Sequence, residues 1–164
     1  PVIENGTEDY QTFKAALHEI NEYLAKQIAG DGEGATALFE VKVKGAESVE
    51  AAKVLAKSIA CSNLTKTAIA GHDANWGRIV CAMGYSGAQF DPEKVDLFFE
   101  SKAGKIQIAE DGVALDFSEE KATEILSQPE VTAIADVKMG DAEATAWGFD
   151  LTHGYIEINA DYRS

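Results

Sequence analysis

A glycine-rich stretch with two carboxylates, GDGEGAT at residues 30–36, is the first place where residue types suggest chemistry. It lacks the Lys-Ser/Thr ending and the GxGxxG spacing of phosphate loops, and Asp31 and Glu33 would repel an anion. A calcium loop is also excluded, because oxygen ligands do not recur at alternate positions. The structural alternative is a helix end followed by a turn. Three glycines around Glu33 instead favour a carboxylate held where backbone can approach a ligand, and such a carboxylate would bind an ammonium group.

A second stretch, GYSGA at residues 84–88, is similar to the nucleophile turn of serine hydrolases. That motif needs G-x-S-x-G between a strand and a helix, whereas Ala88 replaces the final glycine and Gly84 follows a helical pattern. A serine hydrolase is therefore disfavoured. The histidines are expected to be surface residues: His18, His72 and His153.

The segment at residues 63–88 is rich in residues that need specific local surroundings, such as a helix to cap, a packing site or an opposite charge. Asp73 is expected to cap a helix, and Trp76 and Arg78 are suited to anchoring and to charge pairing. Two interpretations stay open at this stage. The segment is either a packed loop and helix corner, in which Asp73 pairs with Arg78, or part of a site.

The C-terminal stretch, HGYIEINADYRS at residues 153–164, is patterned where chain ends are usually not. Its polar groups would serve a ligand or a packed wall, and they come from Asn159, Asp161, Arg163 and Ser164. Its apolar residues are candidates for burial: Tyr155, Ile156, Ile158, Ala160 and Tyr162. A short helix capped by Thr152 is expected, with a strand as the alternative.

Composition and charge limit the function classes. With 164 residues and 46% hydrophobic content, the chain is expected to form a single domain over residues 1–164. A net charge of -14 argues against binding to nucleic acid or to a membrane surface. Cys61 and Cys81 have no partners at disulfide or zinc spacing, so a reducing cytoplasm is expected and no metal or other cofactor is predicted. Pro1 in place of Met suggests a chain trimmed from a longer one.

The elements that position these stretches follow from periodicity. A helix over residues 8–29 is capped by Thr7 and stopped by a left-handed Gly30, and its large apolar residues share one face. A strand over 37–44 follows. The next elements are a helix from Ser48 to near Ser62, a short strand over 65–70, and a helix capped by Asp73 and closed by Gly84.

From residue 95 onward the period is mostly two. VDLFFE, KIQIAE and VALDF predict a small meander, and Ser118 is expected to cap a helix that ends before Pro129. VTAIADVKM and AEATAWGF predict a hairpin joined by Gly140 and Asp141. The predicted class is α+β, with helices packed on a mostly antiparallel or mixed sheet.

Several of these stretches together resemble the ornithine acetyltransferase family, the bifunctional glutamate N-acetyltransferases of arginine biosynthesis. The matching runs are DGEGAT at 31–36, KTAIAGHDANWGRI at 66–79, GYSGA at 84–88, AWGFDLT at 146–152 and INADYRS at 158–164. They occur in the family's order and are spread over most of the chain, from residue 31 to residue 164.

The resemblance implies a precursor that cleaves itself before a threonine, giving an α chain and a β chain. The new N-terminal threonine would take acetyl from N-acetylornithine and pass it to glutamate in a ping-pong cycle, with its own α-amine as the base. Acetyl-CoA is a further possible donor, and an α/β heterotetramer is implied. This sequence resembles the C-terminal part of the β chain without the nucleophile segment. It therefore holds no catalytic residue, and alone it is expected to be inactive and to expose an apolar face toward the missing segment.

The resemblance also implies substrate-binding residues within this chain. Glu33 matches the family's β-chain carboxylate, and Asn159 and Ser164 match its two C-terminal positions. This sequence departs from common family residues at three places: Phe149 for Cys, His153 for Tyr and Ser164 for Thr. Two other functions remain as alternatives: a non-catalytic amino-acid-binding or subunit-interaction domain, and an amidase of the same N-terminal-nucleophile architecture.

Overall fold

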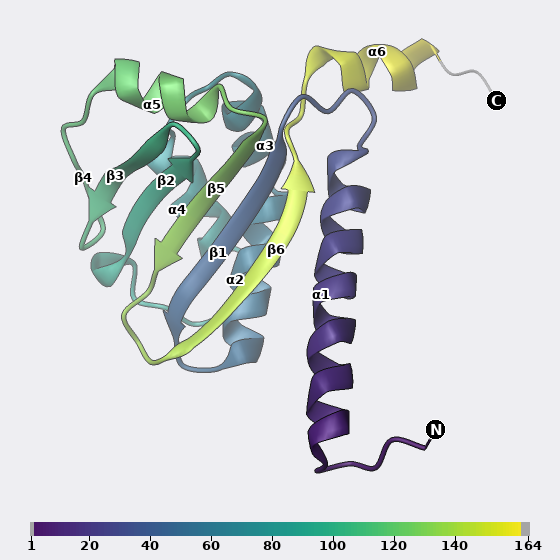
Figure 1. Cartoon of the computed structure of the whole chain (residues 1–164). Coiled ribbons are helices and arrows are strands. Elements are labelled where there is room, and N and C mark those ends of the chain that lie inside the picture. Colours follow the sequence, from purple (N-terminus) through teal and green to yellow (C-terminus); the bar gives the residue numbers. More distant parts are fainter. Residues whose placement is uncertain (1, 162–164) are drawn as a thin grey trace.

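A computed structural model describes residues 2–161. It contains one six-stranded sheet in the order β4-β3-β2-β5-β1-β6, in which β1 and β5 are parallel and all other neighbours are antiparallel (Figure 1). The strands are β1 (Leu38–Ala46), β2 (Asp96–Ser101), β3 (Gly104–Glu110), β4 (Val113–Ala114), β5 (Glu130–Asp136) and β6 (Ala142–Phe149). The predicted α+β class with a mixed sheet is confirmed.

Six α-helices accompany the sheet within the described residues. They are α1 (Glu8–Gly30), α2 (Val49–Cys61), α3 (Asn63–Ala70), α4 (Trp76–Gly84), α5 (Glu119–Leu126) and α6 (His153–Asp161), with a single 3-10 turn, η1, at Pro92–Lys94. The apolar residues of α2, α4 and α5 share one buried core with the sheet. In Figure 1, α2 and α4 lie behind the sheet, whereas α1 stands beside its β6 edge and α6 projects past its end. Among residues 2–161, no helix combines the length and apolar character that crossing a bilayer requires.

Strand β1 shows why one face of the sheet is covered. Phe39, Val41 and Val43 are fully buried on the helix side, and the intervening Glu40 and Lys42 remain partly exposed on the other side. Alternation of this kind was predicted for residues 37–44, because successive side chains of a strand point to opposite faces. The prediction is confirmed, and so are the Ser48 and Ser118 caps of α2 and α5 and the meander of β2, β3 and β4.

The predicted strand over residues 65–70 is wrong, because this segment is helix α3. The Ser62 hydroxyl accepts a hydrogen bond from Thr65 N (3.3 Å) and caps the helix. Thr65, Ala68 and Ile69 are the buried residues, and their spacing of three and four is helical. The cap of α4 was also misassigned, since Asn75 accepts the bond from Arg78 N (3.1 Å) in place of Asp73.

The pairing of Asp73 with Arg78 does not occur. The Arg78 guanidinium donates to the Leu64 carbonyl oxygen (3.0 Å) and to the Thr67 hydroxyl (3.3 Å). Asp73 instead accepts from the Asn75 amide (3.0 Å). The segment at residues 63–88 is therefore a packed corner in which the arginine ties α4 to α3.

The predicted hairpin of β5 and β6 is also wrong. β1 lies between them, parallel to β5 and antiparallel to β6. The Gly140 turn packs against Ala46 at the end of β1, since a Cβ on Gly140 would lie 2.6 Å from the Ala46 carbonyl oxygen. Local turn residues predict a reversal of the chain, but they do not determine which strand fills the gap.

Helix α1 confirms the predicted range but differs from the other long helix in burial. Thr7 caps it, as expected, by accepting a hydrogen bond from Tyr10 N (3.2 Å). Gly30 is its last helical residue and not a left-handed stop, because the cap is Asp31 with φ −91°. None of its 23 residues is buried.

Candidate functional site

The loop that carries Glu33 joins α1 to β1 and packs directly on α6. Ala35 N donates to the Gly32 carbonyl oxygen (2.9 Å) and closes a turn around Glu33. Gly34 has φ +68°, a left-handed conformation that favours glycine. A Cβ on Gly34 would lie 2.5 Å from Tyr155 N, so two backbones are in contact at this point. The glycine pattern of the sequence thus reflects a close approach between the loop and α6.

Asp150 anchors the same loop from the end of β6. Its side chain is only 1% exposed and accepts from Thr36 N (2.7 Å), from Ala37 N (3.0 Å) and from the Thr36 hydroxyl. Several donors offset the cost of burying this carboxylate. Asp150 was not among the predicted site residues, although it lies in the AWGFDLT run that carried the family resemblance.

Helix α6 begins against this loop. The Thr152 hydroxyl donates to the Gly34 carbonyl oxygen (2.6 Å), and Leu151 N donates to the Lys66 carbonyl oxygen (3.1 Å). The predicted C-terminal helix is confirmed at His153–Asp161. The observed bond of Thr152 fastens the start of α6 to the loop.

Glu33 and Asn159 are in contact where the loop packs on α6, although 126 positions separate them in the chain. Asn159 Nδ2 donates to Glu33 Oε2 (2.8 Å) and to the Tyr155 carbonyl oxygen (2.9 Å). A side-chain amide nitrogen has two hydrogens, so both donors of Asn159 are used. Glu33 Oε1 and Asn159 Oδ1 accept no hydrogen bond from residues 2–161. The pair therefore offers oxygen acceptors and a negative charge, which suit an ammonium group.

The third predicted residue, Ser164, lies outside the described residues, as does Tyr162. The predicted burial of the other apolar tail residues is wrong, since Tyr155 is 37%, Ile156 58% and Ile158 47% exposed and Ala160 is also exposed. The reason is geometric. Helix α6 projects from the end of the sheet (Figure 1) and is tied to the Glu33 loop by the bonds of Thr152 and Asn159. On its other side, His153 and Ile156 border a hollow that is shared with the C-terminal end of α3.

Phe149 supports the loop on its other side. A Cβ on Gly32 would lie 2.5 Å from the Phe149 ring, and Lys66 Nζ lies 3.9 Å from the centroid of that ring. Burial lowers the pKa of Lys66 below its ordinary value of 10.5, with only partial compensation from Cys61 and Asp150. A cavity of about 540 Å³ is bordered by Phe149, Lys66 and the C-terminal part of α1. The departure from the family at Phe149 therefore concerns support of the loop.

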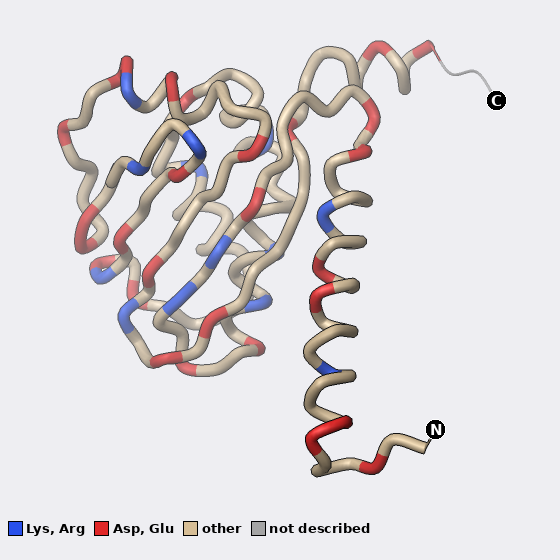
Figure 2. The backbone as a smooth tube through the Cα atoms, in the orientation of Figure 1, with Lys and Arg blue, Asp and Glu red and all other residues tan. Residues whose placement is uncertain are grey.

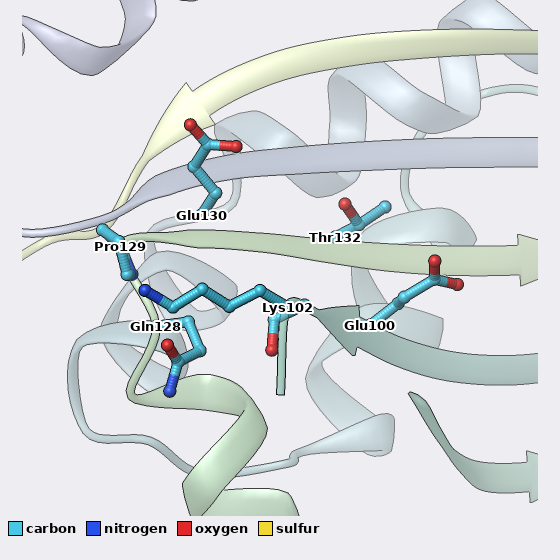
Figure 3. Close-up of a pocket in the computed structure, with 7 residues that line it drawn as sticks. Glu100, Lys102, Gln128, Pro129, Glu130 and Thr132 are labelled. Carbon is cyan, nitrogen blue, oxygen red and sulfur yellow. The ribbon is translucent and has the colours of Figure 1, made fainter. Parts of the chain in front are cut away.

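A separate hollow of about 360 Å³ lies at the same end of the sheet. Its lining comes from β2, β5 and the turns beside them: Glu100, Ser101, Lys102, Gln128, Pro129, Glu130 and Thr132. In Figure 3 the Lys102 side chain extends across it toward Pro129. Neither Glu33 nor Asn159 borders this hollow, so it does not belong to the predicted site.

The remaining chemical candidates hold no reactive arrangement within residues 2–161. Ser86 follows α4 and accepts a hydrogen bond from Ala88 N (3.1 Å), which makes GYSGA a turn. His72 Nδ1 lies 3.3 Å from Ser127 Oγ at the surface. In the described part of the chain, no three His, Cys, Asp or Glu side chains gather closely enough to hold a metal ion.

Fold and site together define an α+β chain in which Glu33 and Asn159 present oxygen acceptors at one end of the sheet. The sequence model of the ArgJ family matches residues 2–164. Over 162 residues the chain is 51% identical to the arginine biosynthesis bifunctional protein ArgJ of Thermotoga neapolitana, and over 163 residues it is 50% identical to ArgJ 1 of Clostridium acetobutylicum. These matches cover 99% of this chain and 41% and 40% of the relatives.

A solved structure gives the same result. The crystal structure of ArgJ from Bacillus halodurans matches with a TM-score of 0.92 and 43% identity, covering 99% of this chain and 75% of that one. The chain therefore belongs to the ArgJ family, which confirms the resemblance seen in its motifs. It spans about two fifths of the length of the curated relatives described above.

Proposed function

We propose that this chain is part of a glutamate N-acetyltransferase that moves acetyl from N2-acetylornithine to L-glutamate. In this proposal Glu33 and Asn159, together with Ser164, bind the amino-acid substrate. The observation that carries the proposal is the contact between Glu33 and Asn159, which leaves two oxygen acceptors free of bonds from residues 2–161. The relatives' names, which place them in arginine biosynthesis, support the choice of substrates.

The geometry favours a particular role for the pair. The side chain of N2-acetylornithine ends in an ammonium group, which has three donors and a positive charge. Glu33 Oε1 and Asn159 Oδ1 are suitable acceptors for that group, and the hydroxyl of Ser164 is a suitable partner for a substrate carboxylate. The chain would thus orient the substrate while the acetyl-accepting threonine is supplied from outside these 164 residues.

The proposed chemistry is a ping-pong cycle on that threonine. Its hydroxyl attacks the acetyl carbonyl of N2-acetylornithine, ornithine leaves, and the amine of glutamate then attacks the acetyl-threonine ester and regenerates the hydroxyl. A second activity with acetyl-CoA as donor fits the word bifunctional in the relatives' names.

The proposed partner is the α chain of a self-cleaved precursor, in a cytoplasmic α/β heterotetramer. One comparison supports division into two chains. The present chain covers 75% of the solved Bacillus halodurans chain but only about 40% of the curated relatives, so the solved chain is much shorter than those relatives.

Substitution of Asn159 and deletion of Ser164 in the complete enzyme test this function. Asn159→Ala, or removal of Ser164 alone, should lower acetyl transfer by about a hundredfold while self-cleavage proceeds, because a misplaced substrate slows the reaction even when the reacting groups are intact. Asn63→Ala, at an exposed position on α3, is the matched control. Unchanged turnover and KM in both variants would contradict the proposed roles.

The same assay separates the alternative functions. An amidase of the same architecture would release acetate from N2-acetylornithine without needing glutamate. A binding or subunit-interaction domain would leave both reactions at background in the complete protein. Acetylglutamate formed in step with ornithine release is the result expected for the transferase.

A further inference from the structure

Helix α1 turns its small and charged side chains toward the rest of the molecule. Its partly buried residues in the C-terminal half are Glu22, Ala25, Lys26 and Ala29, whose spacing of three, one and three marks one helical face. This face lies against the β6 edge of the sheet (Figure 1).

The large apolar side chains of α1 lie on a different face. This apolar stripe consists of Phe13, Leu17, Ile20, Leu24 and Ile28, which are 50%, 44%, 55%, 48% and 77% exposed. At about 100° per residue, the centre of the stripe is roughly opposite the face that meets the sheet. The stripe that would normally be buried therefore points away from the molecule.

A polar cluster fixes this orientation. Lys26 Nζ lies 3.0 Å from Glu22 Oε1 and 3.4 Å from Glu40 Oε2, and it lies 5.6 Å from the centroid of the Trp147 ring. Trp147 Nε1 in turn donates to Glu40 Oε2 (2.6 Å). The bond with Glu22, followed by the charge of Glu40, raises the pKa of Lys26. If α1 rotated about its axis so that the apolar stripe packed on the sheet, the contacts of this cluster would be lost. The stripe therefore has to be buried by a surface other than this sheet.

Two observations indicate what covers it. A second copy is disfavoured, because each chain carries a charge of -14 and α1 itself bears more acidic than basic residues (Figure 2). A large part of the enzyme is available instead, since this chain spans 41% of one full-length relative and 75% of the solved chain. That solved chain matches 99% of this chain, and the matched region therefore includes α1.

We infer that the apolar stripe of α1 is the docking surface for polypeptide of the same enzyme that lies outside these 164 residues. The docked surface is apolar at its centre and carries Lys or Arg at its rim, complementary to the acidic flanks of α1. Because α1 ends at Gly30, three positions before Glu33, docking there also holds the loop that carries Glu33. The inference rests on the exposed stripe and on family membership, not on the proposed acetyl transfer.

Photo-crosslinking in the complete enzyme tests the inference. A benzophenone amino acid replaces Leu17 in the stripe or, as the control, the exposed Gln11 on another face of the same helix. After irradiation, position 17 should crosslink to a peptide of the same enzyme from outside these residues, at several times the yield of position 11. A crosslink to α1 of a second copy, a crosslink to an unrelated protein, or a yield no higher than the control would overturn it.

Thiol labelling gives an independent measurement. In the complete enzyme, a thiol introduced as Leu17→Cys should react with maleimide about tenfold or more slowly than one introduced as Gln11→Cys, because a covered side chain reacts only through local opening. Equal rates would overturn the inference. Adding Asn159→Ala should leave both rates unchanged, so failure of this docking surface is distinguishable from failure of the proposed substrate site.

Discussion

Helices α1 and α2 have similar sequence patterns but differ in how far their apolar side chains are buried. Both are amphipathic and both are capped by a hydroxyl side chain, yet α2 buries Leu55 and Ile59 completely and α1 buries no residue. The difference lies in what each helix has to pack against. The α2 stripe meets strands β1 and β6 of its own chain, whereas the α1 stripe faces away from them. Periodicity therefore predicts which face of a helix is apolar and would be stabilised by burial. It does not predict whether residues of the same chain bury that face.

The largest expected effect contrasts matched leucines in the two helices. Leu55→Ala should lower the free energy of unfolding of this chain by about 2–5 kcal/mol, because it leaves a cavity in the core. Leu24→Ala on α1 should change it by less than about 0.5 kcal/mol. Urea unfolding measures both. Equal losses would mean that α1 packs on the body.

The next effect concerns the junction between the packed body and the Glu33 loop. Asp150→Ala should cost about 3 kcal/mol, because the partly buried N–H groups of Thr36 and Ala37 lose the acceptor that the buried carboxylate provides. Asp141→Ala, an exposed carboxylate in the turn before β6, is the control. A loss no larger than that of the control in thermal unfolding would show that the loop is held by other contacts.

A smaller effect separates two glycines of the same stretch. Gly34→Ala should destabilise the chain by about 1–3 kcal/mol, since it forces a left-handed conformation and its Cβ meets the backbone of α6. Gly30→Ala should change stability by no more than about 0.5–1 kcal/mol, because the added methyl group would have no atom within 4 Å apart from its chain neighbours and the backbone of its own helix. Paired unfolding curves test this difference. If the two variants unfold alike, the contact between the loop and α6 is not tight.

The smallest effect is a pH dependence at Lys66. Burial places the pKa of Lys66 below its ordinary value of 10.5, so the unfolded chain holds more protons than the folded chain between the two pKa values. Stability contributed by this group should therefore rise with pH in the window just below 10.5. In Lys66→Met this rise should be absent. The difference in unfolding free energy between the unsubstituted chain and the variant should therefore change with pH within this window. Parallel profiles from pH 8 to pH 10.5 would contradict the burial of Lys66.

Much of the fold was predictable because its elements carry local signals. Hydroxyl caps and apolar residues spaced three or four apart specify helices α2 and α5, and alternation of apolar and polar residues specifies the strands of the meander. These signals are local and do not depend on distant residues. The errors arose where distant residues decide the outcome. Strand β1 enters between β5 and β6, and α3 is a helix because Thr65, Ala68 and Ile69 find a common buried side.

The candidate site was predictable only in part. Glu33 stood out because glycines surround it, but only the family resemblance placed Asn159 in the same site, and their contact across 126 positions was not predicted. Asp150 was missed because a lone acidic residue after a strand has no periodic signal that distinguishes it from a surface residue. Its importance follows from burial and from the donors of the loop, which are tertiary properties.

The role proposed for Glu33 is tested most directly by Glu33→Gln in the complete enzyme, with kinetics and thermal unfolding measured on the same preparation. The substitution keeps the shape of the side chain and the contact with α6 but removes the charge that would hold the ammonium group. We expect catalytic efficiency with N2-acetylornithine to fall by about 10- to 100-fold while the melting temperature is nearly unchanged, because a charge-assisted hydrogen bond to substrate is lost. A clearly lower melting temperature with unchanged catalytic efficiency would contradict the proposed role and would make Glu33 a structural residue.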